Sequence, residues 1–307
     1  MENIVINQAL KNKLKQIKMV VFDIDGTLIA HQKVWDGKIN ELHLEALRQL
    51  KLNSYLVVLA SARTMVTIDH LHQNPYVDYF IGGNGSFIYD CKLAKIIDEN
   101  VINGDDVNHL LKQIDHRQAK SMTLYGREII YTNGLETDVN HYILAPFKNQ
   151  ISALFNYQDQ KTDLIVIETN DQEINEKLTN EINQFLKDVK SNLTIGAIQS
   201  KVIMLTNQGV NKLSAIKRLA KLCNYDLTNV MAFGDSTNDI EMLQGCAIGI
   251  VMKNASKKMY QYGDLVTITS AKNGGIYHTL VKLAVFNKKQ QKTFIRHGHK
   301  NGTFREI

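Results

Sequence analysis

Short apolar runs rich in β-branched residues recur along the chain, and such runs are typical of buried strands. They fall at 19–24, 55–60, 79–81, 230–233, 246–250 and 265–268. Apolar side chains spaced three or four residues apart, around 42–50 and 213–220, predict amphipathic helices between some of these runs. Because strands and helices alternate, we expect an α/β fold, with a Rossmann-like, doubly wound parallel sheet covered by helices on both faces.

The middle of the chain has a different pattern. Strand-like segments at 122–125, 128–131, 163–169 and 201–206 are mixed with helical segments at 105–116 and 172–189. This mixture predicts a separate α+β module inserted into the first domain. We therefore expect a discontinuous core domain at 1–84 and 208–288, an inserted module at 85–207 and a basic tail at 289–307.

The composition is ordinary for a globular protein. Of the 307 residues, 44% are apolar and 22% are charged, which allows a sizeable core. The length exceeds that of a single typical domain and suggests two domains. No apolar run approaches the roughly 20 residues of a membrane span, and the start of the chain lacks the pattern of a secretory signal. We therefore expect a cytoplasmic protein with no membrane partner. Cys91, Cys223 and Cys246 are odd in number and far apart, which argues against a disulfide framework and a thiolate metal site.

Positive charge is concentrated near the end of the chain, from residue 288 to residue 305, where the sequence contains Lys288, Lys289, Lys292, Arg296, Lys300 and Arg305. Such a tail could contact nucleic acid, but a basic run at a chain end is more often a solvated terminus. It also lacks the regularly interleaved aromatic residues that stack on single-stranded bases. A nucleic-acid partner is therefore not expected, and the formal net charge of +5 is modest for this length.

Two carboxylates, Asp23 and Asp25, stand where the first apolar strand ends and Gly26 turns the chain. Residues i and i+2 of a strand point the same way, so the two side chains emerge together. Like charges held this close need a cation, a shared proton or a reacting group between them. A solvated acidic turn is the plain alternative for this pair taken alone.

Three further segments place polar groups where the predicted sheet and helices would bring them to the same edge. Ser61 follows the second strand, Lys212 stands near the start of a helix, and Asp235 and Asp239 follow the strand at 230–233. In an open parallel sheet, ligands bind beyond the carboxyl ends of the strands, near the point where strand order reverses. Carboxylates from two strand ends suit a hard cation such as Mg²⁺.

These segments, in this order, resemble the motifs of the haloacid dehalogenase-like (HAD) superfamily of phosphohydrolases. More narrowly, the chain resembles its Cof-type branch, in which a type IIB α+β cap domain is inserted between the second and third motifs, and the resemblance covers about residues 18–285. Further similarity lies at 83–86, 253–255 and 273–276. The chain departs from the usual pattern at Ala62 and Lys253, where relatives usually have glycine.

The resemblance implies a Mg²⁺-dependent phosphatase that hydrolyses small phosphorylated metabolites, such as sugar phosphates, nucleotides or phosphorylated cofactors, through an aspartyl-phosphate. Asp23 would be the nucleophile and Asp25 the general acid and base. The metal would be held by the Asp23 side chain, the Asp25 main-chain carbonyl and the Asp235 side chain, with Asp239 orienting this shell. The remaining assignments are phosphate binding by Ser61, Lys212 and Asn238, and substrate contact by Arg63, Asn84 and Asn254, with Tyr125, Arg127 and His141 as weaker candidates.

Two other functions stay open from the residues alone. A phosphomutase of the same superfamily would share the aspartyl-phosphate chemistry and pass the phosphoryl group to another hydroxyl. A non-catalytic binding or regulatory protein could keep the fold without the reaction. The second alternative has no chemical need for Asp23, Asp25, Lys212 and Asp235 together, and the sequence contains all four.

Overall fold

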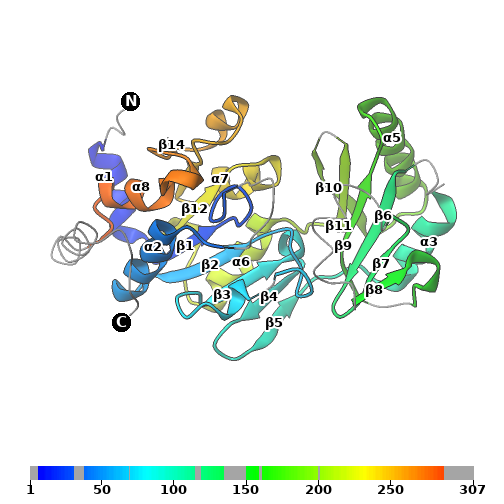
Figure 1. Cartoon of the computed structure of the whole chain (residues 1–307), viewed down its shortest axis with the longest axis horizontal. Helices are drawn as coiled ribbons and strands as arrows, with labels where there is room; N and C mark the ends of the chain where they lie inside the picture. The colour runs from blue at the N-terminus through cyan, green and yellow to red at the C-terminus, as the bar shows by residue number, and fades with distance from the viewer. Residues whose placement is uncertain are drawn as a thin grey trace.

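The computed structural model describes residues 6–30, 38–68, 70–114, 119–134, 150–158, 161–199 and 201–286. Two β-sheets, each with its own helices, make up this part of the chain (Figure 1). The larger sheet consists of β1 (Met19–Phe22), β2 (Leu56–Ala60), β3 (Tyr79–Gly82), β4 (Phe87–Asp90), β5 (Lys95–Glu99), β12 (Val230–Gly234), β13 (Ile248–Val251) and β14 (Leu265–Val266). The smaller sheet consists of β6 (Ser121–Gly126), β7 (Ile130–Thr132), β8 (Ile151–Ala153), β9 (Thr162–Glu168), β10 (Leu193–Gln199) and β11 (Val202–Asn207). The helices are α1 (Gln8–Gln16), α2 (Glu41–Leu52), α3 (Gly104–Gln113), α5 (Gln172–Asp188), α6 (Lys212–Leu222), α7 (Ile240–Gly245) and α8 (Gly275–Lys282).

The larger sheet has eight strands in the order β14-β13-β12-β1-β2-β3-β4-β5. Neighbouring strands are parallel from β14 to β3, and β4 and β5 continue the sheet as antiparallel strands. The chain proceeds outward from β1 in one direction through β2 and β3, and later in the other direction through β12, β13 and β14. Strand order therefore reverses at β1, which is where a doubly wound sheet binds its ligand.

Helices cover both faces of the larger sheet because successive side chains of each strand point to opposite sides. On one face, Val20 and Phe22 of β1 belong to a buried apolar cluster that also contains side chains of α1, α2 and α8. On the other face, Met19 and Val21 pack in a cluster with α6 and α7. This arrangement confirms the predicted α/β fold class with a parallel sheet between two helical layers.

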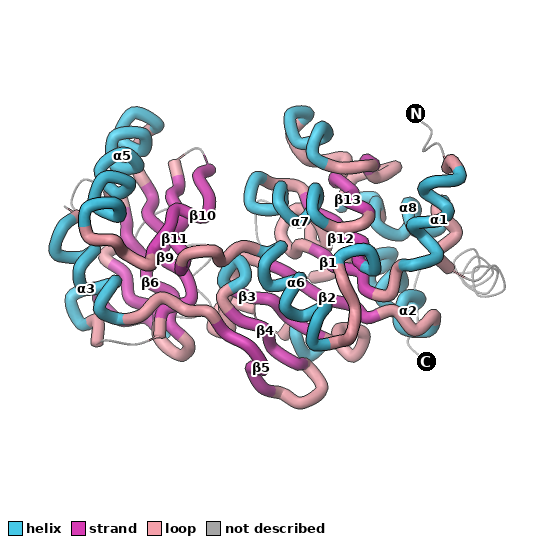
Figure 2. Tube along the Cα trace, turned by 180° about the vertical axis from the view of Figure 1, so that it is seen from behind, coloured by secondary structure: helices cyan, strands magenta, loops and turns pink. Residues whose placement is uncertain are grey.

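The smaller sheet has six strands in the order β10-β11-β9-β6-β7-β8 and is antiparallel except between β7 and β8. Helices α3 and α5 contribute to the buried cluster on one face, and both views show them on the side turned away from the larger sheet (Figures 1 and 2). On the opposite face, Tyr125 and Leu164 pack in a cluster with Ala62 and Val66 of the larger sheet's loops. The α+β part of the chain thus covers the loop that follows β2.

Strands β4 and β5 lie in the larger sheet, although the sequence placed residues 85–207 in the inserted module. β4 pairs with β3, and β5 pairs with β4, so the first strand of the smaller sheet begins only at Ser121. Where the chain leaves and re-enters the larger sheet, the Asn207 amide donates to Asn100 Oδ1 at 2.7 Å. The domain bounds themselves stay a prediction.

Two smaller predictions can be compared with the structure, and a third cannot. Cys91, Cys223 and Cys246 are free thiols, as expected. In the segments covered by the structure, no helix combines the length and apolar character needed to cross a bilayer. The basic tail at 289–307 lies outside the described residues.

A buried histidine joins the loop after β1 to the start of α8. His43 is fully buried, its Nδ1 donates to the Leu28 carbonyl at 2.8 Å, and its Nε2 accepts from the Ile276 N–H at 3.3 Å. Both contacts are satisfied only by the neutral ring that carries its proton on Nδ1. Burial is the main cause that lowers the pKa of His43 to about 4, and His278 contributes in the same direction while the Leu28 contact opposes it.

Acid should therefore destabilise the fold through His43. The stabilisation is fully present above the unfolded pKa of about 6.5 and is lost as the pH falls toward the folded value of about 4. We expect this group to cost about 2 kcal/mol of unfolding free energy between pH 7.5 and pH 5, measured by urea unfolding. The loss should be absent in His43→Gln and retained in His109→Gln, which changes an exposed histidine on α3. An equal pH response in the wild type and His43→Gln would contradict the assignment.

Candidate active site

Two neighbouring strands bring the acidic residues together at the reversal point of the sheet. Asp23 directly follows β1, and Asp235 directly follows β12. The two strands pair in parallel with Phe22 opposite Phe233, and these rings stack with centroids 5.2 Å apart. Stacking of this kind contributes about 0.5–1.5 kcal/mol and fixes the two strand ends side by side.

Asp239 closes the acidic cluster from one turn further along. Its Oδ2 accepts the backbone N–H groups of Asp235 and Ser236 at 2.9 and 3.0 Å. A Cβ on Gly234 would come within 2.6 Å of the Asp239 Cβ, so glycine is required for this approach. Ligand oxygens of Asp23, Asp235 and Asp239 all lie within 4.8 Å of one another.

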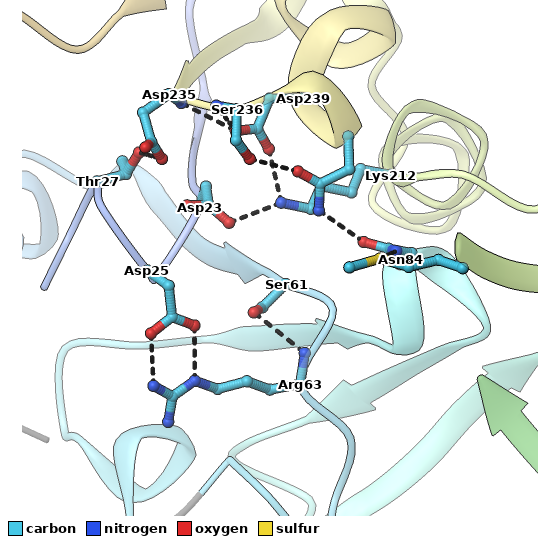
Figure 3. Close-up of polar contacts among 12 residues, drawn as sticks. Asp23, Asp25, Thr27, Ser61, Arg63, Asn84, Lys212, Asp235, Ser236 and Asp239 are labelled. Carbon is cyan, nitrogen blue, oxygen red and sulfur yellow. Dashed lines mark hydrogen bonds and ion pairs between the residues drawn. The ribbon is translucent and has the colours of Figure 1, made fainter. Parts of the chain in front are cut away.

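A single lysine lies between two of these carboxylates. Lys212 Nζ donates to Asp23 Oδ1 and to Asp239 Oδ1, both at 2.6 Å, and its side chain is completely buried (Figure 3). Lys212 is the first residue of α6, whose N-cap Asn211 forms a capping box with Ser214. The cap fixes where the helix begins, and hence where the ammonium group lies.

The buried cluster contains more carboxylates than ammonium groups, and this imbalance shifts the pKa values of its members. Burial raises the pKa of Asp23 well above its ordinary value, Lys212 partly counteracts this, and the three nearby carboxylates raise it further. Burial lowers the pKa of Lys212, but the attraction of Asp23 and Asp239 outweighs it and raises the pKa above the ordinary value. One buried ammonium therefore faces more negative charge than it can neutralise.

The cluster has the features of a cation site. Asp23 Oδ2 is buried and has no hydrogen-bond partner, and an orphaned carboxylate oxygen is costly unless a cation or proton satisfies it. Asp235 Oδ1 accepts from the Thr27 hydroxyl at 3.1 Å, which orients this carboxylate toward the same region (Figure 3). Oxygen donors of this kind fit a hard divalent cation.

Asp25 points to a different partner. Both of its oxygens accept from the Arg63 guanidinium, at 2.8 Å from Nε and 2.6 Å from Nη2, in a two-pronged ion pair (Figure 3). Arg63 also donates from Nη1 to the Thr67 carbonyl at 3.3 Å. Ser61 stands next to this pair, buried, with its Oγ accepting the Arg63 backbone N–H at 3.2 Å. The structure thus brings Ser61, Asp25 and Arg63 to one side of the acidic cluster.

The three predicted amide side chains all have partners. Asn238 Nδ2 donates to Asn84 Oδ1 at 2.9 Å, and its Oδ1 accepts from the Ser236 hydroxyl at 2.6 Å. Asn254 donates to the Gly26 carbonyl and accepts from the Ala271 N–H, both at 2.8 Å. The Asn254 amide therefore ties the loop after β1 to the turn before α8.

Two of the three weaker substrate candidates, Tyr125 and Arg127, lie on the β6–β7 hairpin of the smaller sheet. Tyr125 is buried in the apolar cluster with Ala62 and Val66. Arg127 Nε lies 2.9 Å from Asp163 Oδ1, and its guanidinium stacks 4.5 Å above the Phe87 ring, so it joins the two sheets. His141 lies outside the described residues.

Sequence reasoning gave no role to Thr27, Ser236 or Met204. Thr27 and Ser236 lie inside the recognised motifs, and their hydroxyls could have been considered as partners of the carboxylate and amide beside them. Met204 contacts Asn84, with the Asn84 Nδ2 to Sδ distance at 3.5 Å. Nothing in the local pattern of β11 points to this contact, because it depends on how the two sheets meet.

Comparison with known proteins agrees with this geometry. A family model described as haloacid dehalogenase-like hydrolase matches residues 20–280. The chain is 24% identical over 261 residues to the 5-amino-6-(5-phospho-D-ribitylamino)uracil phosphatase YcsE of Bacillus subtilis, covering 84% of this chain and 92% of that protein. It is 27% identical over 271 residues to the HMP-PP phosphatase of Yersinia enterocolitica, covering 86% and 94% of the two chains.

The fold has close counterparts among solved structures. The HAD subclass IIB sugar phosphatase BT4131 superposes with a TM-score of 0.71 at 20% identity, covering 88% of this chain and 100% of that one. This likeness shows the fold, with its parallel-sheet core and α+β cap. Because the family model spans most of the chain, the resemblance seen in the motifs is confirmed: the chain belongs to the haloacid dehalogenase-like hydrolases and is a phosphoric monoester hydrolase.

Proposed function

We propose that this protein is a Mg²⁺-dependent phosphatase of small phosphorylated metabolites that works through an aspartyl-phosphate on Asp23. One observation carries the proposal. Asp23 stands at the reversal point of the sheet with one oxygen held by Lys212 and the other buried without a partner. Such a carboxylate is oriented for attack on phosphorus, and its second oxygen is available to a cation.

In the first step, a carboxylate oxygen of Asp23 attacks phosphorus while the bond from phosphorus to the leaving oxygen breaks. Asp25 gives its proton to that leaving oxygen. In the second step, water attacks the phosphorus of the aspartyl-phosphate, Asp25 takes the proton of the water, and the bond to Asp23 breaks. The Asp23 carboxylate and inorganic phosphate are the products, so each group returns to its starting state.

The ion pair with Arg63 determines whether Asp25 is free to transfer a proton. The guanidinium engages both Asp25 oxygens, so this contact has to loosen before Asp25 can carry a proton to the leaving oxygen. A substrate phosphate offers Arg63 an alternative anionic partner with matching fork geometry. In this role Arg63 contacts the substrate, as the sequence predicts, and also releases Asp25.

Asp23, the Asp25 main-chain carbonyl and Asp235 would hold Mg²⁺, and Thr27 keeps Asp235 in place. When bound, the cation supplies positive charge that stabilises the phosphoryl oxygens in the transition state. Asp239 would orient the metal ligands without binding the metal directly, because its two oxygens are already engaged by Lys212 and by backbone N–H groups. The proposal therefore keeps the predicted metal ligands and keeps Asp239 as an orienting residue.

The phosphate would be held by Lys212, the Ser61 hydroxyl and Asn238. An amide nitrogen has two hydrogens, so Asn238 keeps one for a phosphate oxygen after donating the other to Asn84. Asn254 likewise keeps one amide hydrogen after donating the other to the Gly26 carbonyl, so it stays a proposed substrate contact while it ties the Gly26 loop to the turn before α8.

A small phosphorylated metabolite is the substrate class that fits best. Both relatives described above are named as phosphatases of small phosphorylated compounds. The smaller sheet packs over the Ala62 loop with mainly apolar side chains, so it would meet the part of the substrate that is not phosphate. The cytoplasmic location stays a prediction from the sequence.

A panel of sugar phosphates, nucleotides and phosphorylated cofactors tests the function by release of inorganic phosphate. We expect release from at least one member with Mg²⁺, and a fall of at least about tenfold when EDTA replaces the metal. Phosphate release without a bisphosphate activator supports hydrolysis, whereas isomer interconversion without release would identify a phosphomutase. A protein that releases no phosphate from any member but binds DNA with steep salt dependence would contradict the proposal.

A further inference from the structure

A left-handed turn lies between the two sheets, beside the proposed phosphate site. It comprises Gly83, Asn84, Gly85 and Ser86, and the first three have φ values of +56°, +56° and +112°. Asn84 is buried in this conformation, which costs a non-glycine residue on the order of 1 kcal/mol. Strain of this kind persists only where the surroundings hold it, so the contacts of the turn are informative.

On the side of the larger sheet, the turn touches the segments that carry the phosphate ligands. Gly83 and Asn84 donate their backbone N–H groups to the carbonyls of Arg63 and Ser61 at 2.8 and 2.9 Å. A Cβ on Gly85 would lie 2.3 Å from the Asn211 carbonyl, so the turn packs directly against the helix start that carries Lys212. The third contact is the hydrogen bond from Asn238 to Asn84 Oδ1.

On the side of the smaller sheet, the same turn touches two strands. Asn84 Nδ2 points to Met204 Sδ on β11 at 3.5 Å, and the Ser86 hydroxyl donates to the Asp163 carbonyl on β9. Strand β10 lies against the turn at Thr237–Asp239, which contains Asn238. The Asn84 amide is therefore placed with its oxygen toward the phosphate site and its nitrogen toward the smaller sheet (Figure 3).

We infer that Asn84 is a positioning residue that couples the seating of the smaller sheet to the orientation of Asn238. The inference rests on the proposed function and gives Asn84 a different role from the predicted substrate contact. When Met204 is in place, it favours one orientation of the Asn84 amide, and that orientation presents oxygen to Asn238. Asn238 is held from its other end by Ser236, so its remaining N–H is aimed at the phosphate only while both partners are present. Placement of the smaller sheet over the site would thus also orient Asn238 toward the phosphate.

Asn84→Gly is the sharpest test, since glycine adopts this φ without strain and the substitution removes only the amide. We expect kcat on the best substrate of the panel to fall about tenfold while KM changes less than about threefold, because orientation within the bound complex is lost. Asn224→Gly is the matched control, since Asn224 also has a positive φ of 58° but lies beyond the end of α6. Its kcat should stay within about twofold of wild type.

Met204→Leu keeps the side-chain volume and removes the sulfur acceptor. If Met204 acts through Asn84, the double variant Asn84→Gly/Met204→Leu should have the kcat of Asn84→Gly alone. Losses that multiply in the double variant, or an Asn84→Gly kcat within about twofold of wild type, would overturn the inference.

Hydrogen exchange gives a readout that needs no turnover. Mg²⁺ with inorganic phosphate should slow amide exchange in β10 and β11 of the wild type and of Asn224→Gly, but not of Asn84→Gly. Equal slowing in all three proteins, or none in the wild type, contradicts the coupling. A wild type that binds phosphate but releases none from any ester would refute the proposed function, and the exchange comparison would still decide the role of Asn84.

Discussion

Asp23→Asn should abolish turnover, with kcat falling by at least about a thousandfold on any substrate that the wild type hydrolyses. The amide is nearly isosteric with the carboxylate but is too weak a nucleophile to form the covalent intermediate. It also replaces a carboxylate oxygen of the acidic cluster that would bind the cation. Phosphate release under saturating substrate and Mg²⁺ is the measurement.

The stability of the same variant separates chemistry from folding. Burial and neighbouring carboxylates already disfavour the charged form of Asp23, so removing its charge should leave the free energy of unfolding unchanged or increased. Asp188→Asn, which changes an exposed carboxylate at the end of α5, is the matched control and should keep full activity. If Asp23→Asn retains more than a tenth of the wild-type rate, Asp23 is not the nucleophile.

Lys212→Met should damage both activity and stability. The substitution leaves Asp23 and Asp239 buried without their shared counter-charge, and breaking a buried ion pair in this way costs about 3–5 kcal/mol. We expect kcat to fall at least about a hundredfold, because the ammonium no longer holds Asp23 or neutralises the phosphate. Urea unfolding and phosphate release measure the two effects.

The effect of Mg²⁺ on stability tests the same explanation of the Lys212→Met result. A divalent cation bound by the acidic cluster would replace part of the missing positive charge, so Mg²⁺ should stabilise Lys212→Met more than it stabilises the wild type. Lys217→Met removes an exposed lysine from the same helix and should change neither quantity appreciably. A Lys212→Met protein as stable as the wild type in EDTA would show that the two carboxylates do not need this counter-charge.

Much of the larger sheet could be predicted because its central strands are buried on both faces and read as short apolar runs. The expected strands at 55–60 and 230–233 agree with β2 and β12 to within one residue at each end. β10 was missed, since Thr194 and Gly196 interrupt its apolar pattern and Ile198 is partly exposed at the edge of the smaller sheet. β4 and β5 are not among the strands that the sequence predicts, and their place in the larger sheet depends on pairing with β3, which the residues of an antiparallel strand do not specify.

The sequence was also sufficient to predict that the site residues converge, but not which side chains they contact. Placing Asp23 and Asp235 at strand ends was sufficient to predict that they meet, because parallel strands end at one edge of the sheet. The roles assigned to them stay predictions. The partners were not predictable: the Arg63 side chain reaches Asp25, and the Asn254 amide reaches the Gly26 carbonyl and the Ala271 N–H.

The amino-acid sequence by itself determined the alternation of strands and helices, the motifs at the strand ends and the family to which they point, since these depend on local pattern and order along the chain. Only the tertiary structure decided that Lys212 lies between Asp23 and Asp239, that one Asp23 oxygen is left without a partner, and that Met204 contacts Asn84. The physical reason is that each of these features depends on how segments far apart in sequence are placed. Their distances are set by how helices and sheets pack, and a local pattern contains no information about that packing.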